Sequence, residues 1–202
     1  MGRPAYIALE GTEGCGKSTQ ARLLATELGA TLTRETGGTP VGERLREILH
    51  DVDVTDLDSR AEALMIAADR AQHITRVVLP ALDSGRDVVS DRSIYSTLAY
   101  QGHGRRIDLS ELRRINDWAV RGRWPDVVVL LDVTDEVVVE RLAGRHLDRF
   151  EREAASFYGR VRDGFRKMAA DDERRWLVID ASPSVDEVAA AVLSAVNAHL
   201  DP

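Results

Sequence analysis

Apolar residues occur along the chain in short continuous runs and in longer segments with helical spacing. The runs are typical of buried strands and predict strands at residues 6–9, 31–34, 87–90, 127–133 and 176–180. Helical patterns lie between the runs. This alternation predicts an α/β fold with a central parallel sheet of about five strands flanked by helices. Ligands bind such sheets at the carboxyl ends of the strands.

Several helices carry boundary signals. A helix is expected over residues 19–28, because its apolar residues share one face and Gly29 follows as a stop signal. Two further helices are expected to begin after Asp108 and Ser184, each of which precedes a glutamate by three residues, the spacing of a capping box. A long helix is expected over about residues 58–82.

Composition and charge narrow the class of protein. The chain has 202 residues, 44% hydrophobic and 30% charged, which fits one globular domain over residues 1–202. A net charge of −7 argues against a nucleic-acid partner. Cys15 is the single cysteine, which excludes an internal disulfide. No apolar run reaches the roughly 18 residues of a membrane span, and residues 1–11 do not resemble a signal peptide. We therefore expect a cytoplasmic protein without a membrane partner.

The stretch EGTEGCGKST at residues 10–19 contains a phosphate-binding loop, in which Gly11 and four further residues precede Gly16, Lys17 and Ser18. Glycines let backbone N–H groups turn toward phosphate oxygens. The ammonium of Lys17 is expected to reach the outer phosphates, and the hydroxyl of Ser18 to bind Mg²⁺. The predicted strand before the loop and the helix after it supply the setting that this chemistry requires.

Charged residues follow the other predicted strands, where a phosphorylated ligand would bind. Asp91 is a candidate second ligand for Mg²⁺. Arg92 carries a planar guanidinium that can hold a phosphate through two parallel N–H groups. Arg34 and Glu35 precede a glycine-rich turn and can face the same cleft, although such a pair alone is usually a surface ion pair.

Residues 91–102 combine hydroxyl, amide and aromatic side chains. Helical spacing places Ser96 and Tyr100 on one face, with Thr97 and Gln101 beside them, as in a reader of a base and a sugar. The alternative is that the aromatic residues belong to the core and have solvated hydroxyls. Arg70 lies in the long predicted helix, and from the residues alone it is expected to be a solvated charge.

Three arginines surround a glycine in a segment at about residues 141–151. Arg141, Arg145 and Arg149 could form a lid that places positive charge on a transferred phosphoryl group and excludes water. The alternative is an exposed helix–loop–helix with solvated charges.

The motifs EGTEGCGKST, TRETGGT, EALMIAADRAQH, DRSIYSTLAYQG, WPDVVVLLDV and LDRFE stand in the order and spacing of bacterial thymidylate kinases. The chain resembles that family over about residues 6–193. The resemblance implies a P-loop NTPase fold of the nucleoside-monophosphate-kinase type, and transfer of the γ-phosphate of ATP to dTMP with Mg²⁺, a step in dTTP biosynthesis. It also implies a homodimer.

The resemblance assigns residues to three sets. ATP would be bound by Gly11, Thr12, Glu13, Gly14, Cys15, Gly16, Lys17, Ser18 and Thr19. The acceptor would be surrounded by Glu35, Arg46, Ile66, Arg70, Arg92, Ser96, Thr97, Tyr100 and Gln101. Catalysis would use Lys17, Arg92, Arg141, Arg145 and Arg149, and the metal would lie at Ser18 and Asp91.

The resemblance also gives roles to single residues. Glu13 would lie near the acceptor, and Arg92 would hold the acceptor phosphate for in-line attack. Arg70, with the region of Thr97 and Gln101, would read the thymine edge. Tyr100 would crowd the 2′ position of the sugar and so favour deoxyribose.

The chain departs from the family pattern at a few positions. Thr36 replaces a proline in the TRETGGT turn, and Ser93 replaces the usual tyrosine or histidine. Gly14 stands where some members keep a catalytic arginine, which implies that a lid arginine supplies this charge. Ile66 replaces a phenylalanine that stacks on thymine, which implies weaker base selectivity, by about 1 kcal/mol. The alternatives are therefore a kinase for another deoxynucleotide, such as dUMP or dGMP, or a regulatory protein that binds nucleotides without turnover.

Overall fold

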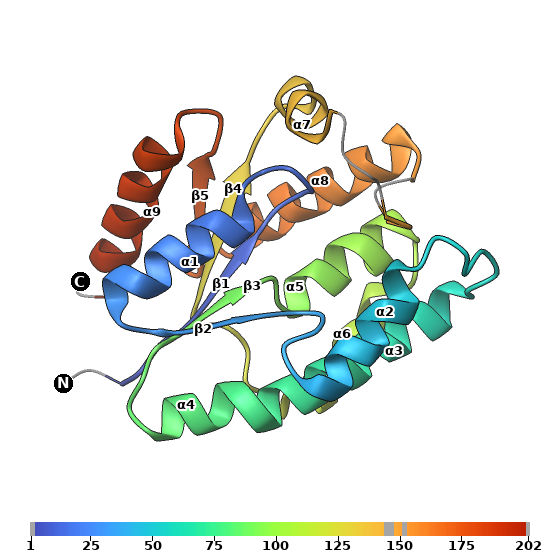
Figure 1. Cartoon of the computed structure of the whole chain (residues 1–202), viewed down its shortest axis with the longest axis horizontal. Coiled ribbons are helices and arrows are strands. Elements are labelled where there is room, and N and C mark those ends of the chain that lie inside the picture. The colour runs from blue at the N-terminus through green and yellow to red at the C-terminus, as the bar shows by residue number, and fades with distance from the viewer. Residues whose placement is uncertain (1–2, 144–147, 151–152, 201–202) are drawn as a thin grey trace.

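A computed structural model describes residues 3–143, 148–150 and 153–200 (Figure 1). Its centre is a parallel sheet with strand order β2-β3-β1-β4-β5. The strands are β1 Tyr6–Glu10, β2 Thr31–Arg34, β3 Val88–Asp91, β4 Val127–Asp132 and β5 Trp176–Asp180. The helices are α1 Lys17–Leu28, α2 Pro40–His50, α3 Ser59–His73, α4 Leu79–Asp83, α5 Ile94–Thr97, α6 Leu109–Val120, α7 Asp135–Leu142, α8 Ala155–Asp171 and α9 Val185–Leu200, with π-helical segments η1 Ile74–Val78 and η2 Leu98–Gly104.

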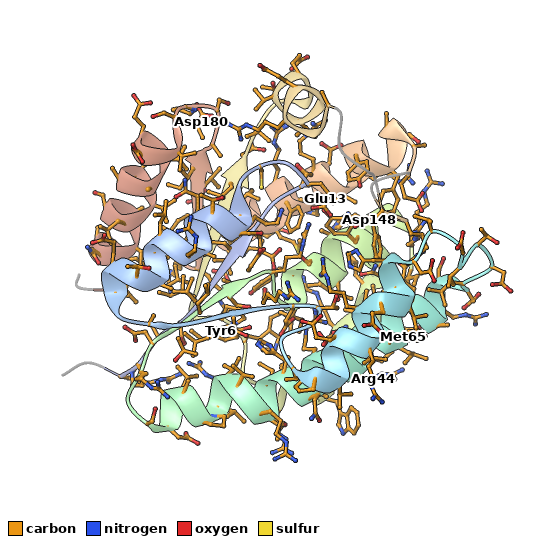
Figure 2. All side chains as sticks on the ribbon, viewed as in Figure 1. Tyr6, Glu13, Arg44, Met65, Asp148 and Asp180 are labelled. Carbon is orange, nitrogen blue, oxygen red and sulfur yellow. The ribbon has the colours of Figure 1, made fainter. Side chains whose placement is uncertain are left out.

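Helices cover both faces of the sheet and enclose a hydrophobic core on each side. Helices α1 and α9 pack on one face, and α3, α5, α6 and α8 contribute to the core on the other (Figure 1). Successive side chains of a strand point to opposite faces of the sheet. Tyr6 of β1 therefore packs in the core on the side of α3, α5, α6 and α8, and Ile7 and Leu9 pack in the core on the side of α1 and α9. Figure 2 shows the side chains that fill the space between the layers.

The predicted boundaries are confirmed to within two residues. Gly29 ends α1 in the left-handed conformation that its lack of a side chain permits. Asp108 caps α6 by accepting hydrogen bonds from two backbone N–H groups, and Ser184 and Glu187 form the predicted capping box before α9. The predicted helix at 58–82 consists of α3, η1 and α4 in succession.

The sheet places the phosphate-binding loop beside the end of β3. Because all strands are parallel, their carboxyl ends share one edge, and the loop after β1 lies next to the residues that follow β3. Leu9 pairs with Asp91, one position before Arg92. Within the described residues, no helix is long and apolar enough to cross a membrane.

Candidate active site

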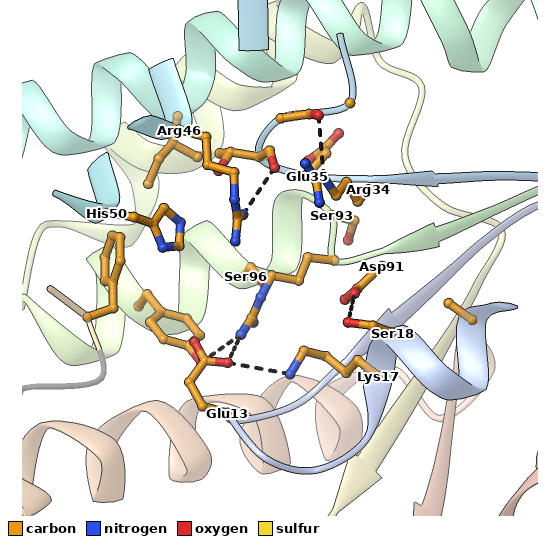
Figure 3. A pocket seen from close by; sticks show the side chains of 18 of the residues that line it. Glu13, Lys17, Ser18, Arg34, Glu35, Arg46, His50, Asp91, Ser93 and Ser96 are labelled. Carbon is orange, nitrogen blue, oxygen red and sulfur yellow. Dashed lines mark hydrogen bonds and ion pairs between the residues drawn. The ribbon is translucent and has the colours of Figure 1, made fainter. Parts of the chain in front are cut away.

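A cleft of about 870 Å³ opens at the carboxyl edge of the sheet (Figure 3). Every residue predicted to surround the acceptor lines it. The phosphate loop contributes Glu13, Gly14, Gly16, Lys17, Ser18 and Thr19. Both halves of the predicted site therefore face one cavity. Gly11, Thr12 and Cys15 complete the loop but are not among the lining residues.

The loop after β1 has the backbone that a phosphate cradle requires. Gly14 and Gly16 have positive φ angles of 74° and 98°, which side chains disfavour. At Gly11, an added Cβ would lie 2.6 Å from the carbonyl oxygen of Leu131, so only glycine fits there. Helix α1 begins at Lys17 and presents its N-terminal end to the cleft. The loop and helix together form an anion-binding site.

Lys17 lies inside the loop with only 7% of its surface exposed. Its Nζ donates to the carbonyl oxygen of Thr12 at 2.7 Å and lies 3.6 Å from a carboxylate oxygen of Glu13 (Figure 3). The ammonium is therefore held at the cleft wall, where it can pair with phosphate oxygens.

Ser18 and Asp91 form a pair of oxygen ligands suited to Mg²⁺. The hydroxyl of Ser18 donates to the Asp91 carboxylate at 2.5 Å, and both residues line the cleft (Figure 3). Among the residues that the structure describes, no cluster of three histidine, cysteine or acidic side chains forms a metal site. A hydroxyl and one carboxylate fit Mg²⁺, which usually takes its remaining ligands from substrate phosphates and water.

Arg92 connects the phosphate loop to the acceptor side. Its guanidinium donates to the carbonyl oxygen of Gly11 at 3.2 Å, to the hydroxyl of Ser96 at 3.1 Å and to the hydroxyl of Tyr100 at 3.2 Å, and it forms an ion pair with Glu13. Burial alone would raise the pKa of Glu13, but Arg92 and a neighbouring lysine outweigh burial and lower that pKa. Arg92 also has a positive φ of 72°, a conformation that is costly outside glycine.

Arg70 is fully buried, with 1% of its surface exposed, so its prediction as a solvated charge was wrong. Its Nε donates to Glu35 at 2.7 Å, its Nη1 to Thr97 at 2.9 Å and to Asn116, and its Nη2 to the carbonyl oxygen of Ser93 at 3.0 Å. Tertiary partners that are distant in sequence account for this burial. A guanidinium has five N–H groups. The four bonds to described residues use the Nε hydrogen, both Nη1 hydrogens and one Nη2 hydrogen. The second Nη2 hydrogen is not used by these bonds.

Three other predicted acceptor residues, Ile66, Gln101 and Arg46, also line the cleft. Ile66 is almost buried on α3. The amide nitrogen of Gln101 donates to Glu62 at 2.8 Å, which fixes the orientation of the amide. Arg46 of α2 donates to the carbonyl oxygen of Thr36 at 3.2 Å, so Arg46 is positioned by the glycine-rich turn.

The predicted lid arginines occupy different places. Arg141 lines the cleft, and its Nη1 lies 3.4 Å from the carbonyl oxygen of Gly14, the loop position where some relatives keep an arginine. Arg149 is not among the lining residues, because its Nη2 pairs with Glu62 at 2.7 Å. Arg145 lies outside the described residues. Of the two predicted lid arginines that the structure describes, Arg141 is the one that faces the phosphate loop.

Sequence reasoning missed Glu10, whose carboxylate positions two serines that line the cleft. The carboxylate is buried at the end of β1 and accepts hydrogen bonds from the hydroxyls of Ser93 at 2.7 Å and Ser96 at 2.6 Å. Burial is the main cause that raises the pKa of Glu10, and the charge of Arg92 opposes it. The sequence feature that could have indicated Glu10 is a carboxylate at the end of an otherwise apolar strand.

Comparisons with known proteins agree with this geometry. The family model described as "Thymidylate kinase" matches residues 9–192. A thymidylate kinase of Pelotomaculum thermopropionicum is 47% identical, covering 97% of this chain and 94% of that protein. One of Halothermothrix orenii is 42% identical, covering 92% and 93%. A crystal structure of thymidylate kinase from Ehrlichia chaffeensis has a TM-score of 0.80 at 32% identity, covering 96% of this chain and 100% of the other. The chain therefore belongs to the thymidylate kinase family, the ATP-dependent kinases that phosphorylate dTMP.

Proposed function

We propose that this cleft converts ATP and dTMP into ADP and dTDP with Mg²⁺, and that the two nucleotides meet at Arg92. One observation carries the proposal. The guanidinium of Arg92 contacts Gly11 and Glu13 of the phosphate loop as well as Ser96 and Tyr100 of the acceptor wall. The acceptor wall is the part of the cleft lined by the predicted acceptor residues Glu35, Arg46, Ile66, Arg70, Arg92, Ser96, Thr97, Tyr100 and Gln101. An arginine at this junction can orient an acceptor phosphate toward the phosphate at the loop.

The proposed chemistry rests on positioning and charge. Lys17 pairs with the outer phosphates of ATP, and Arg92 holds the dTMP phosphate for in-line attack. Arg141 adds positive charge beside Gly14 as the phosphoryl group moves. Ser18 and Asp91 would hold Mg²⁺, which supplies charge neutralisation at the phosphates. The acceptor phosphate is itself the nucleophile, so a strong general base is not required.

Recognition of the base and sugar falls to the acceptor wall. The remaining Nη2 hydrogen of Arg70 is available to a carbonyl oxygen of thymine, and Ile66 offers an apolar surface to the ring. The Tyr100 ring, placed by its hydrogen bond with Arg92, would lie against the 2′ position and disfavour ribose.

We also infer a homodimer in the cytoplasm. Large apolar side chains are exposed on α3 and on the two helices that pack against it, namely Val41 and Ile48 on α2, Leu64 on α3 and Trp118 on α6. A second copy of the chain could cover these residues through a self-complementary contact.

An acceptor panel tests the proposed function. ADP release from ATP is measured with dTMP, dUMP, dGMP and other nucleoside monophosphates. We expect the highest kcat/KM with dTMP. Turnover with another acceptor and none with dTMP would refute the assignment. Binding of ATP without turnover of any acceptor would favour a regulatory protein.

A further inference from the structure

A buried histidine stands behind the acceptor wall. His73 is the last residue of α3, is fully buried and is not among the residues that line the cleft. Its Nδ1 lies 2.8 Å from one carboxylate oxygen of Glu35, and its Nε2 lies 2.7 Å from the hydroxyl of Thr33. The second oxygen of Glu35 accepts the Nε hydrogen of Arg70 at 2.7 Å. These four side chains form one continuous hydrogen-bonded relay.

The protonation states of this relay follow from its partners. Burial would raise the pKa of Glu35, but Arg70 and His73 outweigh burial and lower it, so the carboxylate is ionised and only accepts hydrogen bonds. Nδ1 of His73 must therefore carry a proton. In the neutral ring, Nε2 then accepts the hydroxyl proton of Thr33. Glu35 consequently receives one donor from each side.

Packing fixes the imidazole in place. An added Cβ on Gly38 would lie 2.7 Å from Cδ2 of His73 and 2.5 Å from the carbonyl oxygen of Arg34, so the glycine-rich turn lies directly against the ring. On α3, one turn before His73, Asp69 accepts the backbone N–H of Gly37 at 3.1 Å. The same face of α3 thus holds both the turn and Glu35.

We propose that His73 is a positioning residue for acceptor recognition, acting through Glu35 to fix the guanidinium of Arg70. This proposal rests on the proposed function of Arg70 as a reader of the acceptor base. Without the Nδ1 donor, the Glu35 carboxylate would still accept the bond from Arg70. It would lose the bond from His73 that sets the orientation of the carboxylate. The last Nη2 hydrogen of Arg70 would then be misdirected, so acceptor binding should weaken while ATP binding is unchanged.

Two substitutions at His73 separate positioning from packing. The amide nitrogen of asparagine stands where Nδ1 does, whereas that of glutamine reaches the place of Nε2. We expect His73→Gln to raise the KM for dTMP about tenfold, as for one lost bond to a charged group, and His73→Asn to raise it less than about threefold. Both variants should keep the KM for ATP. Equal losses in the two variants, or a parallel rise in the KM for ATP, would overturn the proposal.

A measurement on the unsubstituted protein keeps the proposal testable if these variants fold poorly. Nitrogen-15 NMR of the histidine side chains reports which ring nitrogen of His73 is protonated. A proton on Nδ1 supports the relay, and a neutral ring protonated only at Nε2 refutes it. This readout does not depend on turnover. If the native enzyme does not use dTMP, the proposed function fails, while the tautomer still decides whether His73 supports Glu35.

Discussion

At the scale of single residues, Arg92 gives the sharpest test of acceptor binding, because its guanidinium reaches the hydroxyls of Ser96 and Tyr100. Arg92→Ala should raise the KM for dTMP about 100-fold, as expected for a lost charge-assisted phosphate contact, and change the KM for ATP by less than about threefold. Steady-state kinetics with each substrate varied in turn measures both constants. Arg86→Ala is the matched control, since Arg86 is exposed just before β3, at the opposite edge of the sheet. Equal losses for the two substrates would contradict the assigned role.

Glu35 should make stability depend on pH. Its pKa lies below the ordinary value of 4.5, because Arg70 and His73 together outweigh the opposing effect of burial. The stability that the ionised Glu35 carboxylate contributes is therefore fully present when the pH is above that ordinary value, and it is lost as the pH falls through the lowered pKa. Glu35→Gln should be less stable near neutral pH and should lose less unfolding free energy between about pH 6 and about pH 3.5. Urea unfolding at both pH values measures this, with exposed Glu27→Gln as the control. If the unfolding free energy of Glu35→Gln falls between the two pH values by as much as that of the native protein, the result would count against an ionised Glu35 carboxylate.

A substitution at Ile66 tests the proposed weaker recognition of thymine, because Ile66 replaces the phenylalanine that is usual in the family. The side chain lines the cleft, so Ile66→Phe should place an aromatic ring against thymine and lower the KM for dTMP about fivefold, the value of about 1 kcal/mol. The KM for ATP serves as the internal control. If neither constant changes, this position does not limit base recognition.

At the scale of elements, the predicted lid is tested at its two described arginines, Arg141 of α7 and Arg149. Arg141→Ala should lower kcat about 100-fold, the usual cost of losing a group that stabilises the transition state. Arg149→Ala should lower kcat less than about tenfold, because its guanidinium is held by Glu62 away from the phosphate loop. Single-turnover rates at saturating substrates compare the two variants. A larger loss at Arg149 would mean that the lid rearranges before transfer.

The elements themselves were largely predictable, and the reasons are local. Continuous apolar runs mark buried strands, and capping residues mark helix starts, so the boundaries at Gly29, Asp108 and Ser184 agree with the structure. The π-helical segments η1 and η2 were not predicted, since a shift of one residue in the backbone hydrogen bonds has no clear signal in residue type.

At the scale of the whole molecule, the predicted acceptor residues and most of the phosphate loop line one cleft, because a parallel sheet brings its strand ends to one edge. The sequence could not predict how Arg70 is buried, since its partners Glu35, Thr97 and Asn116 come from different elements. His73 was missed for the same reason, although its position seven residues after Ile66 places both on one face of α3.

Assembly is the whole-molecule property that remains to be measured. Trp118 is 83% exposed on α6 and is one of the residues that we infer a second copy of the chain covers. Sedimentation should give the mass of two chains for the native protein and of one chain for Trp118→Glu. A native monomer would contradict the dimer and leave the cleft unaffected, since the described residues of one chain line it.

The central claim is that one cleft moves the γ-phosphate of ATP onto dTMP. The most direct test incubates the protein with Mg²⁺, dTMP and ATP labelled in its γ-phosphate, and follows the label by chromatography. We predict that the label appears in dTDP in equal amount to the ADP formed. Label in inorganic phosphate alone, or no release from ATP, would contradict the account.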